Sequence, residues 1–185
     1  EKLDYNQALL KAQKLGYAEP NPSSDVNGSD VASKLNILSS LAFNTFIDNE
    51  NIYVEGINSI DQDDISNANL LGYKIKLLGV AEKTKNKIMQ RVHPSLIKNT
   101  SYVAKIDGVL NAVIADSKPV GQSVLQGEGA GPGPTTSALV SDLCSILRGN
   151  IKFPFVLPNS QRKKANFDLI GEAYFSVYLR LDVID

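Results

Sequence analysis

The sequence is poor in the residues that most often serve metal and redox chemistry. Its 185 residues include one cysteine, one histidine, one methionine and no tryptophan. Cys144 alone cannot form an internal disulfide, which favours a reducing compartment and predicts a cytoplasmic protein. His93 is the only histidine, and the sequence contains no zinc-ligand spacing and no Ser-His-Asp set. We therefore expect no metal site, a structural role for His93, and a buried, unreactive thiol at Cys144.

A strong charge of either sign is also missing, as is any long apolar run. The formal net charge is −1 and no run of like charges forms a tail, so we expect neither nucleic acid nor a membrane as partner. No stretch approaches the roughly 18–20 apolar residues of a membrane span, and the first residues do not resemble a signal peptide. The hydrophobic content of 43% is typical of a folded domain with a core. Because the sequence begins inside a helical pattern without Met, we interpret it as part of a longer protein.

Helical periodicity marks two segments near the start of the sequence. Apolar residues recur at three- and four-residue spacing in residues 3–15, which predicts an amphipathic helix that stops at Gly16. Residues 17–28 contain two prolines and are expected to be irregular. A second helix is predicted from about Ser29 to Ile47, with Asn27 or Ser29 as its N-terminal cap.

The rest of the sequence alternates between strand and helix patterns. Strands are predicted at 52–58, at 73–83, within 88–97 as far as Pro94, in two pieces around Asp107-Gly108, and at 120–131. Helices are predicted at 63–72 and 134–149, a linker at 151–168, and a last strand at 172–185. This order predicts an α+β fold with a mixed or mostly antiparallel sheet and helices packed on one face.

The stretch GYAEPNPSSDVNGSD, residues 16–30, is unusually rich in carboxylates for a loop. Asp30 and Lys34 are spaced i,i+4 and share a helix face, while Glu19 and Asp25 lie in the loop that enters this helix. Carboxylates together form a socket for an ammonium group, and a lysine beside them in a cleft can move a proton. The alternative is an ordinary surface ion pair beside a solvated loop.

A second candidate is the glycine-rich turn QGEGAGPGP, residues 126–134. Such a turn exposes backbone N–H groups and leaves room for a ligand. It is not a dinucleotide fingerprint, because prolines stand where G-x-G-x-x-G needs its third glycine, and it is not a Walker A loop. The alternative is a tight corner between a strand and a helix. We interpret a third polar cluster, Arg162, Lys163 and Lys164, as a solvated loop.

These motifs together resemble a known family. GYAEPNPSSDVNGSDVASKLNILSSLAF, residues 16–43, resembles the signature of homoserine dehydrogenase, whose usual form is roughly GYAEPDP, then D-V-x-G-x-D, then A-x-K-L. Asn21 stands where the family usually has Asp. Segments that follow in the family's order are LGYKIKLLGVA, RVHPSLI, IDGVLNAV and GEGAGPGPTTSALVSDL. The final VYLRLDVID resembles the first strand of the ACT regulatory domain that many of these enzymes have.

The resemblance implies NAD(P)-dependent interconversion of L-homoserine and L-aspartate 4-semialdehyde, a step of threonine, methionine and isoleucine biosynthesis. By the same resemblance, Glu19 and Asp25 match acids that bind the substrate's amino group. Lys34 matches the lysine that moves the hydroxyl proton, and Asp30 matches the acid that orients the substrate and this lysine. Gly131 matches a glycine that approaches the cofactor.

The resemblance also implies a domain organisation. Residues 1–150 correspond to the family's substrate-binding and dimerisation domain, 151–172 to a linker, and 173–185 to the first strand of a truncated ACT-like domain. The family's sheet in this region forms a dimer interface, so a homodimer is expected. The family's N-terminal Rossmann domain, which binds the dinucleotide, has no counterpart in this sequence and would have to act in cis or from a separate chain. We therefore expect the isolated chain to be inactive.

Two other readings of the sequence stay open. In one, the chain is a stand-alone dimeric amino-acid-binding or regulatory module without catalysis. In the other, the resemblance is remote and the carboxylates serve a hydrolase, although the sequence offers no activated nucleophile.

Overall fold

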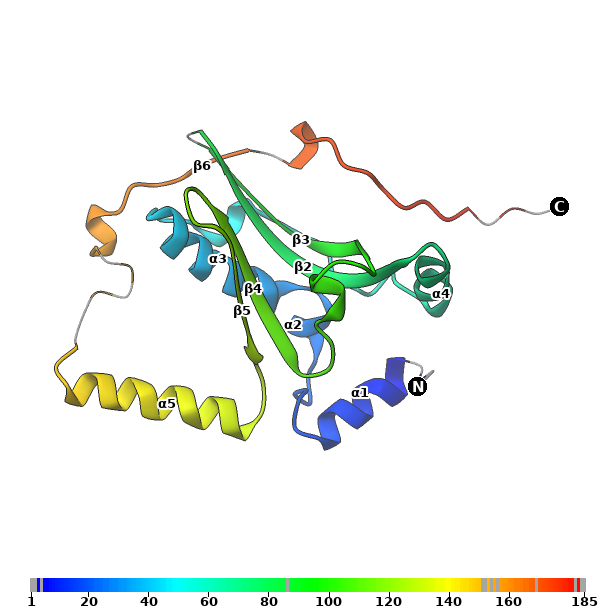
Figure 1. The fold of residues 1–185 in the computed structure, drawn as a ribbon, viewed down its shortest axis with the longest axis horizontal. Coiled ribbons are helices and arrows are strands. Elements are labelled where there is room, and N and C mark those ends of the chain that lie inside the picture. Colours follow the sequence, from blue (N-terminus) through cyan, green and yellow to red (C-terminus); the bar gives the residue numbers. More distant parts are fainter. Residues whose placement is uncertain are drawn as a thin grey trace. The chain divides into compact units, whose positions relative to one another are not determined.

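The computed structural model describes residues 3, 5–85, 87–150, 153, 155, 157–168, 170–181 and 183 (Figure 1). The chain forms two compact units that interleave along the sequence. The first unit is Glu1–Asn21 with Lys98–Ile151, and the second is Pro22–Ile97 with Lys152–Asp185. Helices and strands mix in the order of the chain, and the predicted α+β class with a mixed sheet is confirmed.

The second unit is built on a four-stranded sheet. Its strands are β1 (Ile52–Val54), β2 (Tyr73–Thr84), β3 (Lys87–Lys98) and β6 (Asn166–Phe167). The order is β1-β3-β2, and β6 also pairs with β3. Both β1 and β6 run parallel to β3, with Tyr53 opposite Arg91 and Phe167 opposite Ile88. The helices of this unit are α2 (Ser23–Val26), α3 (Ser29–Phe43) and α4 (Gln62–Leu70).

The core of the second unit lies between α3 and the sheet. Ala32 and Leu35 of α3 are buried against Val92 of β3, and four half-buried side chains pack around them: Val31, Ile52, Leu77 and Ala81. The helix approaches β2 closely at Gly79, where a Cβ atom would lie 3.0 Å from Val31 Cγ1. The small residue at this position lets α3 lie flat on the strand, and this packing fixes the direction of the helix.

The first unit contains two helices and a hairpin. The helices are α1 (Tyr5–Lys14) and α5 (Pro132–Leu147), and strands β4 (Leu110–Ser117) and β5 (Gly121–Glu128) pair antiparallel from Leu110 opposite Glu128 to Ser117 opposite Gly121. Proline at the start of α5 suits a helix terminus, because the first N–H groups have no partner within the helix. No described side chain of α5 is buried, so the prediction that Cys144 is buried was wrong: it is half-buried.

The predicted elements agree with the structure in most places and differ in their ends. Helix α3 stops at Phe43 rather than Ile47, because Asn44 adopts a left-handed backbone (φ 48°) and caps the helix with its N–H to Leu41 O and Ser40 O. Residues 17–28, expected to be irregular, contain the single turn α2. The piece before Asp107-Gly108 is a 3₁₀ turn, Val103–Lys105, and not a strand.

Strand β3 runs through Pro94, which the sequence predicted to stop it. The carbonyl of Val92 accepts from the N–H of Glu55 at 2.8 Å, so Val92 faces β1 with its backbone, and Pro94 faces the same edge two residues later. Strand β1 ends at Val54, opposite Val92. The missing N–H of Pro94 therefore removes no hydrogen bond of the ladder. The imidazole of His93 contacts its neighbours in the chain: Nδ1 lies 2.9 Å from Pro94 O and 3.2 Å from Ser95 Oγ, which agrees with a structural role.

The segment predicted as a linker takes part in the sheet of the second unit. Besides β6, Lys164 forms a parallel bridge with Phe46. Arg162 is 8% exposed, lies over the rings of Phe155 and Phe46, and donates to Thr45 O. The prediction of a solvated loop was therefore wrong for Arg162, whose guanidinium is enclosed by two aromatic rings. The strand predicted at 172–185 is not observed. Residue 172 belongs to a 3₁₀ turn, and residues 173–181 and 183 are irregular. Residues 182, 184 and 185 of that prediction lie outside the described residues.

Candidate active site

Asp30 and Lys34 form an ion pair in the first two turns of α3. Lys34 Nζ donates to Asp30 Oδ2 at 2.7 Å, as the i,i+4 spacing predicts. The Lys34 side chain is 68% exposed and that of Asp30 38%. At this exposure such a pair contributes only about 0–1 kcal/mol to stability. The pair is therefore of more interest as a contact for a ligand than as a support of the fold.

The start of α3 is fixed by Gly28, which lies between Asp25 and Asp30. Gly28 has φ 83°, in the left-handed region that favours glycine, and a Cβ atom there would lie 3.2 Å from the Cγ1 atoms of both Val54 and Val92. The helix therefore begins against the sheet at a point where a side chain would crowd Val54 and Val92. The N-cap residue is Gly28, so the prediction of Asn27 or Ser29 as the cap was wrong, although Asn27 Oδ1 accepts the N–H of Ser29 at 2.9 Å.

The turn α2, which contains Asp25, is attached to the segment after β1. The N–H of Ile57 donates to Val26 O at 2.9 Å, and a Cβ atom on Gly56 would lie 2.3 Å from the same oxygen. Only glycine permits this approach. The Asp25 side chain is exposed, so the backbone around it is fixed while its carboxylate stays open to a ligand. In the sequence, the only signal for the role of Gly56 is an isolated glycine in a strand pattern.

Glu19 and Gly131 belong to the first unit. Gln13 Nε2 donates to Glu19 O at 2.9 Å, while the side chain of Glu19 is exposed. Gly131 precedes α5 with φ 107° and ψ 166°, and a Cβ atom there would meet only Tyr17 Cε1, at 3.8 Å. The backbone of Gly131 is thus open on its Cβ side, as a glycine beside a ligand needs to be.

Of the five predicted site residues, the structure brings Asp30 and Lys34 into contact and places Asp25 in the same unit. The convergence of Glu19 and Gly131 on them stays a prediction. A cavity of about 290 Å³ lies at the other end of α3 and contains none of the five; its lining includes Phe43, Lys83 and Lys163. Within the described part of the chain, no three His, Cys, Asp or Glu side chains group as a metal site. No helix among the described residues is long and apolar enough to cross a membrane.

Beside this region, Tyr53 of β1 donates its hydroxyl to Glu55 Oε2 at 3.0 Å. This hydrogen bond to Glu55 raises the pKa of Tyr53, and partial burial and the charge of Glu55 act in the same direction.

Comparison with known proteins identifies the chain. The sequence model described as homoserine dehydrogenase matches residues 1–144. The chain is 48% identical over 144 residues to the homoserine dehydrogenase of Helicobacter pylori, an alignment that covers 78% of this chain and 34% of that protein. It is 36% identical to that of Bacillus subtilis, covering 100% of this chain and 43% of that one. A crystal structure of a homoserine dehydrogenase from Thiobacillus denitrificans superposes with a TM-score of 0.79 at 38% identity, covering 90% of this chain and 40% of that one.

All three similarities are to oxidoreductases of one kind. The chain belongs to the homoserine dehydrogenase family. It spans about two fifths or less of the length of these relatives.

Proposed function

We propose that this chain is the substrate-binding and dimerisation region of a homoserine dehydrogenase. The enzyme would interconvert L-homoserine and L-aspartate 4-semialdehyde with NAD(P), in the biosynthesis of threonine, methionine and isoleucine. The observation that carries the proposal is the Asp30–Lys34 pair at the start of α3, which lies in the family signature and is fixed against the sheet by Gly28.

Lys34 is the proposed proton acceptor. Oxidation of the alcohol breaks the O–H and C–H bonds of the carbinol and forms a carbonyl. When bound, NAD(P)⁺ accepts the hydride. Lys34, as the free amine, takes the hydroxyl proton, and in the reverse direction its ammonium returns the proton to the carbonyl oxygen. Asp30, at 2.7 Å, favours an orientation of the lysine side chain along the first two turns of α3, and this orientation places the amine for the substrate.

Glu19 and Asp25 are the proposed ligands of the substrate's α-ammonium group. A carboxylate pair satisfies an ammonium through charge-assisted hydrogen bonds, which are roughly twice as strong as neutral ones. Asp25 suits this role because α2 is anchored through Val26 O while its carboxylate is exposed. Gly131 fits the cofactor for a related reason, since its backbone is open on the Cβ side at the N-terminus of α5.

The proposal includes partners. We infer a homodimer formed through the sheet and a Rossmann domain, in cis or on a separate chain, that binds NAD(P) in the cytoplasm. Helix α5 supports a further partner, because its apolar side chains Leu139, Leu143 and Leu147 are 55–77% exposed. Without that domain the 185-residue chain is expected to bind the amino acid and not to oxidise it.

Two measurements test the proposal. Calorimetry of the purified chain should detect binding of L-homoserine, and the substitutions Glu19→Gln and Asp25→Asn should each weaken this binding. Nicotinamide absorbance should show no turnover by the chain alone, and turnover after addition of a family nucleotide-binding domain. Hydride transfer by the chain alone would disprove its inactivity. Binding without turnover in the mixture would favour an amino-acid-binding module instead.

A further inference from the structure

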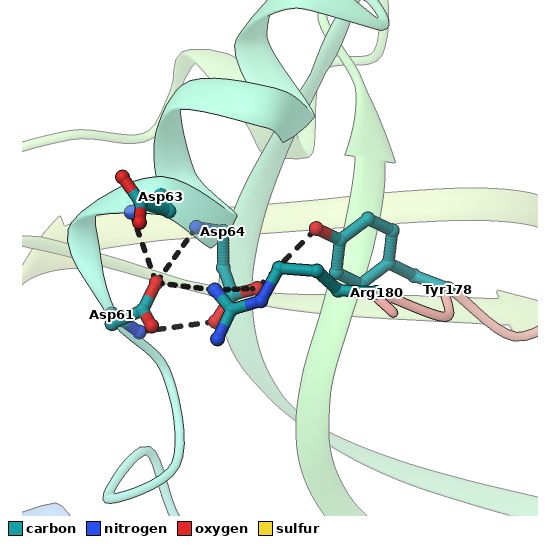
Figure 2. A network of polar contacts seen from close by, with 5 residues as sticks. All are labelled: Asp61, Asp63, Asp64, Tyr178 and Arg180. Carbon is teal, nitrogen blue, oxygen red and sulfur yellow. Dashed lines mark hydrogen bonds and ion pairs between the residues drawn. The ribbon is translucent and has the colours of Figure 1, made fainter. Parts of the chain in front are cut away.

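The C-terminal segment, residues 173–181, contacts the N-terminus of α4 through two side chains (Figure 2). Arg180 Nη1 donates to Asp61 Oδ1 at 2.7 Å and to Asp64 Oδ1 at 2.9 Å. The hydroxyl of Tyr178 donates to Asp64 Oδ1 at 3.3 Å. Residues separated by more than 110 positions thus meet at one helix end, within the second unit.

The two acids that receive Arg180 are already ordered by the helix itself. Asp61 Oδ1 accepts the N–H groups of Asp63 and Asp64, both at 2.9 Å, and Asp64 Oδ2 accepts the N–H of Asp61 at 3.1 Å. This reciprocal capping box fixes both carboxylates side by side. Two fixed like charges repel each other, and Asp64 is only 6% exposed, so a cation between them relieves an unfavourable contact.

The segment has a second contact point on the sheet. The guanidinium of Arg91 on β3 lies 5.0 Å from the centre of the Phe175 ring, within the range of a cation–π contact. Arg91 is in turn oriented by Glu82 of β2, at 2.6 Å. The segment is therefore attached at Phe175 and again at Tyr178 and Arg180, although it forms no strand.

The acceptor Asp61 ends a short loop that also holds α2. From β1 the chain passes Gly56, which touches Val26 and Asn27, and Ile57, whose N–H donates to Val26 O at 2.9 Å. The N–H of Ile60 then donates back to Ile57 O at 3.1 Å, and Asp61 follows. Residues 55–61 thus connect the Arg180 contact directly to the backbone that positions Asp25.

We propose that Arg180 couples the C-terminal segment to the Asp25-bearing turn α2 through the loop of residues 55–61. With Arg180 bound, the end of the loop at Asp61 is held by Arg180 as well as by the capping box of α4, and Ile57 keeps α2 in place. Without Arg180, the capping box alone holds this end of the loop, and α2 loosens. Anything that pulls on the C-terminal segment would then change the position of Asp25. The part of this inference that concerns ligand affinity rests on the proposed function.

The attachment is tested by cleavage of the chain with chymotrypsin. Arg180→Gln removes the charge and should speed cleavage after Phe175 and Tyr178 about fivefold, the effect of roughly 1 kcal/mol for a partly exposed charged pair. Asp63→Asn is the matched control, because it removes a carboxylate from the same turn while Asp61 and Asp64, the acceptors of Arg180, are kept, and it should be cleaved as the parent is. Equal cleavage of the parent and Arg180→Gln overturns the proposal.

The coupling is tested by hydrogen exchange at the amide of Ile57 in the same variants. Arg180→Gln should raise its exchange rate about threefold to fivefold, and Asp63→Asn should leave it unchanged. Faster cleavage with unchanged exchange at Ile57 overturns the coupling. Should Arg180→Gln not fold, Arg180→Lys and Tyr178→Phe, which weaken the contact more gently, replace it. The variant that is cleaved faster must then also exchange faster at Ile57, or the coupling is rejected.

A third readout separates this inference from the proposed function. By calorimetry, Arg180→Gln should weaken L-homoserine binding to the chain about threefold. If the parent chain binds no L-homoserine, the proposed function fails while exchange at Ile57 still decides the coupling. If the parent binds and Arg180→Gln binds equally well although Ile57 exchanges faster, the coupling does not extend to Asp25 and the proposal is overturned.

Discussion

Gly28 lies directly against Val92: a Cβ atom on Gly28 would lie 3.2 Å from Cγ1 of this fully buried strand residue. The contact joins the first residue before α3 to the centre of β3. It sets where the helix begins on the sheet, and so where Asp30 and Lys34 stand in its first and second turns.

Gly28→Ala is expected to destabilise the second unit by about 2–4 kcal/mol. The left-handed backbone costs an L-residue about 1–2 kcal/mol, and crowding against Val54 and Val92 adds about 1–2. Gly72→Ala is the matched control, because Gly72 has nearly the same φ, 81°, with nothing within 4 Å of its Cβ position. Urea unfolding of both variants measures the difference. Equal losses for the two would mean that the contact with Val92 contributes nothing.

Lys34→Met is expected to lower turnover by about 10²–10⁴-fold in the enzyme that joins this region to its nucleotide-binding domain, because the proton acceptor is removed. Its effect on stability should stay below about 0.5 kcal/mol, since the pair is exposed. Lys87→Met breaks an ion pair of the same length, 2.7 Å to Asp168, away from the site. Steady-state kinetics should show nearly parental turnover for Lys87→Met. A similar loss in both would assign Lys34 a structural role.

Arg162→Ala is expected to cost about 2–4 kcal/mol of the free energy of unfolding. The side chain is 8% exposed, packs on two aromatic rings and donates to Thr45 O, so its removal leaves a hole and an unpaired carbonyl. Lys163→Ala, next in the sequence and exposed, should change the unfolding free energy by less than about 0.5 kcal/mol. Thermal or urea unfolding distinguishes them, and indistinguishable variants would contradict the enclosed position of Arg162.

Local patterns were enough to predict most of the elements. The helix at α4, its end near Gly72, and strands β2 and β5 follow from periodicity and glycine punctuation within about a dozen residues. The prediction that Pro94 stops its strand was wrong, because the effect of a proline on β3 depends on where the neighbouring strand β1 ends. The end of β1 lies in a different segment of the sequence. The burial of Arg162 was missed because the rings of Phe46 and Phe155 flank it only in the folded chain, where Thr45 and Lys163 are hydrogen-bonded.

The candidate site shows the same division. The Asp30–Lys34 contact follows from helix spacing and was predictable from a separation of four residues. The tight approach of Gly56 to Val26 O joins segments thirty residues apart, and the Arg180–Asp61 pair joins residues 119 apart. Sequence periodicity does not predict such contacts, because each depends on tertiary packing that forms only in the folded chain.

The pH dependence of stability should report the Arg180 contact. The Arg180 hydrogen bond, followed by the backbone N–H groups of Asp64 and Asp63, holds the pKa of Asp61 far below its usual range. The network around Asp61 and Arg180 also contains Asp63, Asp64 and Tyr178 (Figure 2). A carboxyl whose pKa is lowered on folding stabilises the fold fully above its unfolded pKa, about 4, and loses that contribution as the pH falls below it. The difference in urea midpoint between the parent and Asp61→Asn should therefore be constant from about pH 5 to 8 and shrink below about pH 4. In an Arg180→Gln background the difference should be smaller throughout, and a difference independent of both pH and Arg180 would show that the ion pair does not stabilise the chain.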